Sequence, residues 1–80
     1  MEVDRDSSEP PHRQVARQLR DRIRSGELTG RLPSAVTLAQ ETGIAVLTGR
    51  KALRLLVSEG WARMEPGMGT YAVPESEWPS

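Results

Sequence analysis

Residues 43–73 read Gly-Ile-Ala-Val-Leu-Thr-Gly-Arg-Lys-Ala-Leu-Arg-Leu-Leu-Val-Ser-Glu-Gly-Trp-Ala-Arg-Met-Glu-Pro-Gly-Met-Gly-Thr-Tyr-Ala-Val, and this stretch decides the fold. Residues 46–59 contain no proline, and small or apolar residues recur there at steps of three and four. This spacing predicts a helix with one buried stripe, made of Gly49, Ala52, Leu53, Leu56 and Val57. Gly60 follows directly and is the expected end of that helix.

The residues after Gly60 predict a β-hairpin. Residues 61–65 and 70–73 are short β-prone runs, and the loop Pro-Gly-Met-Gly joins them. Trp61 is expected to seal the core beneath the hairpin. A helix that carries Arg50, Lys51 and Arg54 and leads into a hairpin is typical of the working end of a winged helix.

Two further helices are predicted upstream. Over residues 11–25, Val15, Leu19 and Ile23 form a row at steps of four. Ser34 is a good N-cap for a short helix that ends near Thr42, before a glycine. A helix, a short glycine-containing turn and a second helix form a helix-turn-helix. The predicted fold is therefore mainly α with a small β-hairpin: a winged helix-turn-helix of three helices plus wing.

Arg31 and Leu32 are expected to add a strand of one or two residues beside the hairpin. Four arginines form a second row along the first helix, and this row can either meet a phosphate backbone or serve as a solubilising face (Arg13, Arg17, Arg20 and Arg24).

The net charge of zero conceals a segregation of charge. Residues 1–9 have a net charge of −3 and residues 74–80 a net charge of −2, whereas residues 10–73 hold ten basic against five acidic residues. We therefore divide the chain into a disordered acidic arm (1–10), a winged helix-turn-helix domain (11–73) and an acidic tail (74–80). A basic body suits a polyanionic partner, for which the acidic ends can compete.

The composition argues against several other classes. The chain has no cysteine, no signal peptide and no apolar run near the roughly 20 residues that a membrane span needs. We therefore expect a cytoplasmic, nucleoid-associated protein. His12 is the only histidine, so no metal site is expected, and no nucleophile elbow or P-loop is present. We expect neither an enzyme nor a cofactor.

Eight segments follow one another in a fixed order along residues 11–73: Val15-Ala-Arg-Gln-Leu-Arg-Asp-Arg-Ile, Ser25-Gly-Glu-Leu, Leu32-Pro-Ser, Leu38-Ala, Gly43-Ile, Arg50-Lys-Ala-Leu with Leu56, Glu59-Gly-Trp and Gly67-Met-Gly-Thr-Tyr. In this ordered set the sequence resembles the DNA-binding domain of GntR-type bacterial regulators. The resemblance implies a winged helix-turn-helix that binds operator DNA, usually as a dimer on an inverted repeat.

The chain departs from the family pattern at the starts of the second and third helices. Val36 and Val46 stand where the family usually has arginines that touch DNA, so of the three such arginines only Arg50 is retained. Ala45 lacks the hydroxyl that would cap the third helix, at a cost of about 0.5–2 kcal/mol. Gly49 replaces a usual β-branched core residue, and we expect it to cost roughly 1 kcal/mol in helix propensity as well as some packing.

The third helix supplies most of the candidate DNA contacts. Arg50 is the leading candidate, because it can pair with guanine or with phosphate. Thr48 can bond a phosphate, a base edge or only a carbonyl of its own helix. Leu47 can meet a thymine methyl or join an apolar protein-binding patch with Val46 and Leu55, but we expect it to be partly buried instead.

The remaining candidates are basic side chains and the wing. Lys51 and Arg54 are either phosphate contacts or solvated charges. Arg63, on the first wing strand, can reach a phosphate or form a salt bridge with Glu65 or Glu59. The resemblance implies that the backbone at Gly67 approaches a minor groove.

We expect the partner to be double-stranded operator DNA, with a homodimer as the possible binding form and no small-molecule effector in this chain. The alternative is a winged helix used for protein contact, in which Val36, Val46 and Leu47 form an apolar surface.

Overall fold

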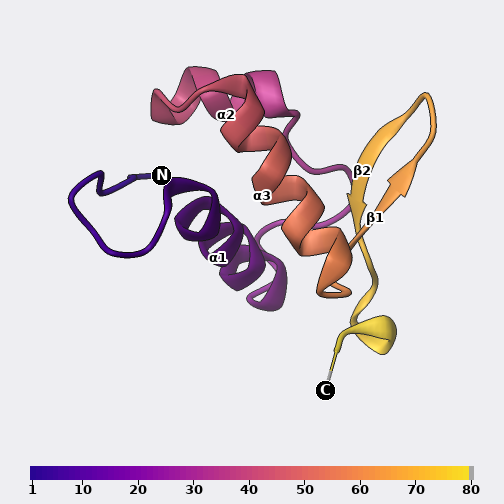
Figure 1. Cartoon of the computed structure of the whole chain (residues 1–80). Coiled ribbons are helices and arrows are strands. Elements are labelled where there is room, and N and C mark those ends of the chain that lie inside the picture. Colours follow the sequence, from indigo (N-terminus) through magenta and orange to yellow (C-terminus); the bar gives the residue numbers. More distant parts are fainter. Residues whose placement is uncertain (80) are drawn as a thin grey trace.

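The computed structural model describes residues 1–79, and Figure 1 shows a group of helices followed by a hairpin and a short tail. The helices are α1 (Pro11–Arg24), α2 (Ala35–Thr42) and α3 (Val46–Ser58). The strands β1 (Ala62–Glu65) and β2 (Gly69–Ala72) form the wing, and a short 3-10 helix, η1 (Glu75–Glu77), follows. This arrangement is the predicted winged helix-turn-helix. No helix within this part of the chain is long and apolar enough to cross a membrane.

The helix ends follow local chemistry. The Oγ of Ser34 accepts a hydrogen bond from the Thr37 amide at 3.1 Å and so caps α2, as predicted. Gly43 ends α2 in the left-handed conformation, with φ of 76°, and the chain turns directly into α3. Ala45 stands at the N-cap of α3, where no side chain caps the helix. The first helix of the helix-turn-helix therefore has a well-defined end at Gly43, whereas the second helix starts without a side-chain cap.

The wing is held by more than its own two strands. Residues of β1 and β2 pair in antiparallel register, from Ala62 with Ala72 to Glu65 with Gly69. On the other edge of β2, the Leu32 amide donates to the Thr70 carbonyl at 2.8 Å and the Ala72 amide donates to the Gly30 carbonyl at 2.8 Å. The short strand expected near Arg31 is thus present as a bridge to Tyr71.

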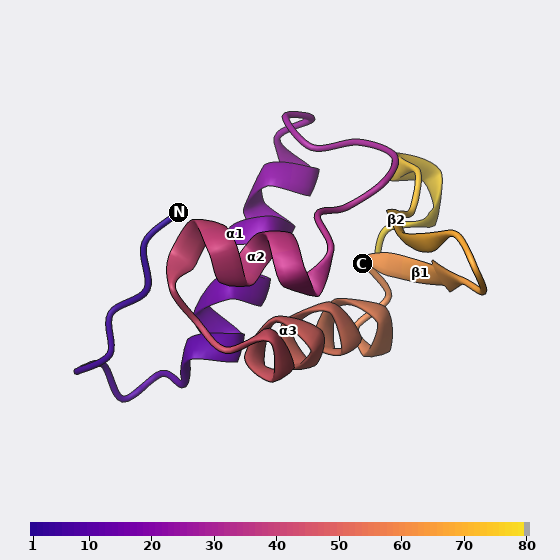
Figure 2. The ribbon, with the colours of Figure 1, turned by 90° about the horizontal axis from the view of Figure 1, so that it is seen from above.

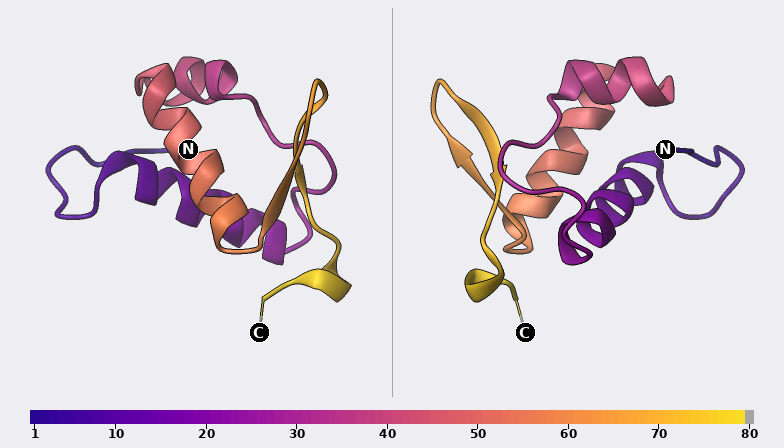
Figure 3. Two further views of the ribbon diagram at one scale, coloured as in Figure 1. Left: turned by 45° about the vertical axis from the view of Figure 1, so that its right-hand side comes forward. Right: turned by 180° about the vertical axis from the view of Figure 1, so that it is seen from behind.

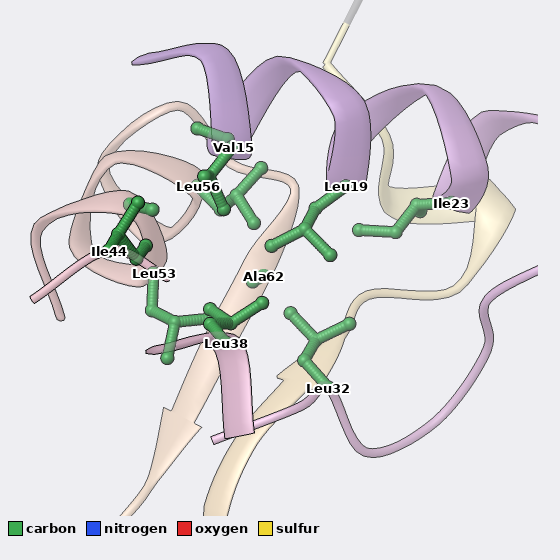
Figure 4. Packing of buried hydrophobic residues seen from close by; sticks show 11 residues of the cluster. Val15, Leu19, Ile23, Leu32, Leu38, Ile44, Leu53, Leu56 and Ala62 are labelled. Carbon is green, nitrogen blue, oxygen red and sulfur yellow. The ribbon is translucent and has the colours of Figure 1, made fainter. Parts of the chain in front are cut away.

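The core lies between α1, α2, α3 and the base of the wing. Figure 4 shows apolar side chains that meet there from all of these elements. Leu19, Leu38 and Leu56 are completely buried, so each helix contributes at least one side chain that is removed from water. With no phenylalanine in the sequence, aliphatic side chains fill this core.

Gly49 corrects one expectation from the sequence. It is buried, and a β-carbon at this position would stand 2.9 Å from the carbonyl oxygen of Ala35 in α2. The glycine therefore does not leave a packing defect. It allows α2 and α3 to approach more closely than a larger residue would permit.

The N-terminal arm, residues 1–9, forms neither helix nor strand but follows a definite path against α1. The side chain of Gln14 is buried and donates hydrogen bonds to the carbonyls of Asp4 and Glu9, both at 2.7 Å. A guanidinium nitrogen of Arg5 donates to the Gly43 carbonyl at 2.8 Å. Disorder of this arm in solution stays a prediction.

The tail folds back on the base of the wing. The indole N–H of Trp78 donates to the Val73 carbonyl at 3.1 Å, and its ring lies against Trp61 with a centroid distance of 5.8 Å. Figure 3 shows the hairpin tip and α2 at one end of the molecule and the tail at the other. The tail is therefore remote from the wing tip.

Candidate nucleic-acid interface

A hollow of about 260 Å³ lies between the start of α2, one side of α3 and the inner side of the wing. Figure 2 shows α2, α3 and the wing from above. Three arginines from separate parts of the fold line it: Arg31 beside the wing, and Arg50 and Arg54 on α3. Ser34 and Met64 also line it. We call the surface formed by these five residues the groove face.

The cations of the groove face have no acidic partner within the described residues 1–79. Arg50 and Arg54 are exposed. The ion pairs among residues 1–79 involve other arginines, namely Arg17, Arg20, Arg22 and Arg63. In addition, α3 carries no acidic residue between its two ends. The groove face therefore presents positive charge to solvent, which suits a polyanion.

The arginine row of α1 behaves differently. Arg17 donates to the carboxylate of Glu9 at 2.9 Å, and this hydrogen bond lowers the pKa of Glu9 and raises the pKa of Arg17 relative to their ordinary values. The Arg20 guanidinium lies 3.4 Å from Asp21, and the Arg24 guanidinium lies 5.9 Å from the centre of the Trp61 ring. Three of the four arginines thus have partners within the chain, which favours the solubilising interpretation of this row.

The expectation of partial burial for Leu47 is wrong. The residue is 58% exposed in the first turn of α3, opposite the buried stripe. Val46 beside it and Val36 in the first turn of α2 are also exposed, at 37% and 53%. The two helix starts thus carry exposed aliphatic side chains on the same part of the molecule as the start of α3.

Thr48 and Lys51 lie away from the groove face. On an ideal helix, Thr48 projects about 160° from Arg50, and Lys51 about 100° from it. Thr48 is half-buried, whereas Lys51 is exposed and borders a separate shallow depression together with His12. By helix geometry, Leu47, Arg50 and Arg54 therefore project from one side of α3 and Thr48 does not, and of these residues Arg50 and Arg54 line the hollow.

The two wing residues predicted to contact DNA, Arg63 and Gly67, lie in different parts of the hairpin. The Nε of Arg63 lies 2.8 Å from the Glu65 carboxylate, so this pair forms the predicted salt bridge. Alternate residues of a strand point to opposite faces, and Met64 lines the groove face, so Arg63 lies on the far side of the wing. Gly67 lies at the open tip with φ of 75°, and an added β-carbon there would have no neighbour within 4 Å.

Arg31 is the groove-face residue that the sequence did not single out as a contact. Its side chain crosses the hairpin so closely that a β-carbon on Gly69 would stand 3.0 Å from its Nε. The available signal was its position, directly before Leu32 and in the short strand expected beside the hairpin.

Known proteins that are similar to this chain are DNA-binding regulators. Residues 11–72 match the family described as "Bacterial regulatory proteins, gntR family". The HTH-type transcriptional repressor NagR of Bacillus subtilis is 37% identical over 73 residues, which cover 89% of this chain and 30% of NagR. The chain therefore spans under a third of this relative's length.

Two solved structures are similar along most of their own length. YtrA from Sulfolobus acidocaldarius, a GntR-family transcription factor, superimposes with a TM-score of 0.82 and 33% identity over 91% of this chain and 79% of YtrA. AraR(DBD) in complex with operator ORX1 gives a TM-score of 0.80 and 26% identity over 91% of this chain and 95% of that domain. The chain belongs to the GntR family of bacterial regulatory proteins and carries its winged helix-turn-helix DNA-binding domain.

Proposed function

We propose that this chain binds double-stranded operator DNA with its groove face, with α3 in the major groove and the wing along an adjacent minor groove. One observation carries the proposal: Arg31, Arg50 and Arg54 share one hollow, and none of them forms an ion pair within residues 1–79. A major groove about 12 Å wide admits an α-helix. The solved AraR(DBD) complexes are with operator DNA, which supports the same partner here.

The side chains of the groove face have separate roles in this proposal. Arg50 stands near the start of α3 and pairs with guanine through its two-pronged guanidinium. Arg54, one helical turn later, and Lys51, on the outer side, neutralise phosphates and contribute affinity rather than sequence preference. Arg31 reaches the backbone between the two grooves, and the open backbone at Gly67 approaches the minor groove without a side chain in the way.

Two copies on an inverted repeat form the second part of the proposal. The family resemblance supports it, and half-sites about one helical turn apart are the expected spacing for a symmetric helix-turn-helix pair. Selected binding sites that contain one half-site only, bound by one copy, would contradict this part and leave the first part intact.

Selection of duplexes from a randomised library, followed by titration of a labelled selected duplex at two salt concentrations, tests the proposal. Binding should weaken steeply with salt, because each neutralised phosphate adds about one unit to the slope of log affinity against log salt. Arg50→Ala should abolish the preference for the selected sequence. Arg63→Ala is the matched control, because this arginine is also exposed but does not line the hollow and is paired with Glu65. Equal effects of the two substitutions would reject the proposal.

The protein-contact alternative is not favoured. The family consists of transcription regulators, and solved neighbours include domains bound to operator DNA. A protein partner placed on the exposed aliphatic residues of α3 would also have to desolvate the neighbouring cations, which is costly without matching acidic groups.

A further inference from the structure

We propose that Leu47 reads a thymine methyl group, so that the preferred DNA site of this chain has a T·A pair next to the base pair contacted by Arg50. This inference rests on the proposed function and deepens it, because it names the base chemistry that the groove face selects. It is carried by the position, exposure and charged surroundings of one leucine.

The apolar surface at the helix starts is a cluster rather than one stray side chain. A single exposed leucine is ordinary in proteins. Here Val46 and Leu47 open α3, while Val36 lies in the first turn of α2, and all three are more than one third exposed. The two first turns adjoin each other, because Gly49 of α3 packs against Ala35 of α2. Such a cluster indicates a surface that is covered in a complex.

Leu47 projects with the cations of the groove face. On an ideal helix it lies about 60° from Arg50 and about 20° from Arg54. A long ligand that lies along α3 and contacts both guanidinium groups therefore also faces the isobutyl group of Leu47. The ligand must combine negative charge with a small apolar group at one place on its surface.

Thymine in a DNA duplex meets this description. In the major groove, its C5-methyl is the apolar feature of the base edge, and it lies inside the phosphate walls that attract the cations. Because α3 holds three basic residues and no acidic one, DNA complements this surface in charge, whereas an apolar protein surface does not.

The sharpest test changes the DNA rather than the protein. Deoxyuridine differs from thymidine only in the missing methyl group and keeps the same base pairing. A duplex selected by the chain is prepared with each thymine replaced singly by deoxyuridine, and affinity is measured by fluorescence anisotropy for the unaltered chain, for Leu47→Ala and for Val46→Ala. We expect one replacement to weaken binding of the unaltered chain about fourfold, which corresponds to the loss of one buried methyl group.

The same replacement should have no effect on Leu47→Ala and should still weaken binding of Val46→Ala. Uniform affinity across all uracil replacements would overturn the inference but leave the proposed function standing. A uracil effect that persists in Leu47→Ala would assign the methyl contact to another residue and would also overturn it. If Leu47→Ala weakens thymine and uracil duplexes equally and changes the assembly state in sedimentation, Leu47 is a protein contact. Failure to retain any duplex from the library would instead reject the proposed function itself.

Discussion

Gly49 in α3 faces the backbone of Ala35 in α2, and a β-carbon at Gly49 would come within 2.9 Å of the Ala35 carbonyl oxygen. The contact fixes how deeply the second helix sits against the third. Because the opposing atom belongs to the backbone, it cannot be moved by a change of rotamer.

The first prediction concerns this contact. Gly49→Ala should lower the free energy of unfolding by about 1–2 kcal/mol, since overpacking outweighs the roughly 1 kcal/mol that alanine gains in helix propensity. Urea denaturation of the variant measures the change. Lys51→Ala, an exposed position on the same helix, is the control and should stay close to the unaltered chain. A Gly49→Ala variant that proves more stable would show that α2 can shift at little cost.

The second prediction concerns the uncapped start of α3. Ala45 has φ of −68° and ψ of 149°, a conformation that suits an N-cap residue. Ala45→Ser should therefore raise stability by about 0.5–1 kcal/mol, because its hydroxyl can accept a hydrogen bond from a free amide of the first turn. Thermal unfolding measures this gain. Ala45→Val adds bulk without an acceptor, and an equal gain from valine would refute the capping explanation.

The third prediction separates two exposed arginines near the wing. Arg31→Ala should weaken duplex binding and reduce the salt slope by about one, as expected for the loss of one phosphate contact. Arg63→Ala removes the same charge from β1, where the arginine is already paired with Glu65, and should leave the slope unchanged. Titrations over a series of salt concentrations compare the two. Matching slopes for both variants would mean that only net charge matters and that the groove face is not the binding surface.

The fourth prediction concerns acid pH. Because the folded state lowers the pKa of Glu9 through the hydrogen bond from Arg17, this pair stabilises the fold above the ordinary pKa of a glutamate, and the contribution is lost as pH falls through the lowered value. The raised pKa of Arg17 has no effect at working pH, since an arginine is charged throughout that range.

Titration of the Glu9 carboxylate by NMR measures this shift. Arg17→Gln should return the pKa of Glu9 toward its ordinary value. Arg13→Gln should change it less, because Arg13 acts on Glu9 only through charge and without a hydrogen bond. Identical titration curves for the two variants would show that the arm does not hold Glu9 against α1 in solution.

Sequence reasoning succeeded where the signal was local. The apolar period of residues 46–58, the cap at Ser34 and the glycine at position 43 each act on neighbouring residues, so the helices and their ends could be predicted. The hairpin could be predicted for the same reason, because two short β-prone runs are joined by a glycine-containing loop. These features account for the fold.

The errors concern residues whose partners lie far along the chain. The packing cost expected at Gly49 is absent, and the sequence does not reveal this because the residue that fills the space, Ala35, belongs to another helix. Arg31 was not recognised as part of the site because the hairpin that positions its side chain comes much later in the sequence. Partial burial is the expectation for Leu47 that proves wrong, because its place opposite the buried stripe leaves it exposed to solvent.

The backbone bonds from Gly30 and Leu32 to β2 have a mechanical consequence. They tie the hairpin to the segment that leads into α2, so the position of the wing relative to the helix-turn-helix is fixed by backbone hydrogen bonds. Substitutions of outward-facing side chains on the hairpin should therefore change the chemistry of the wing surface without changing its distance from α3.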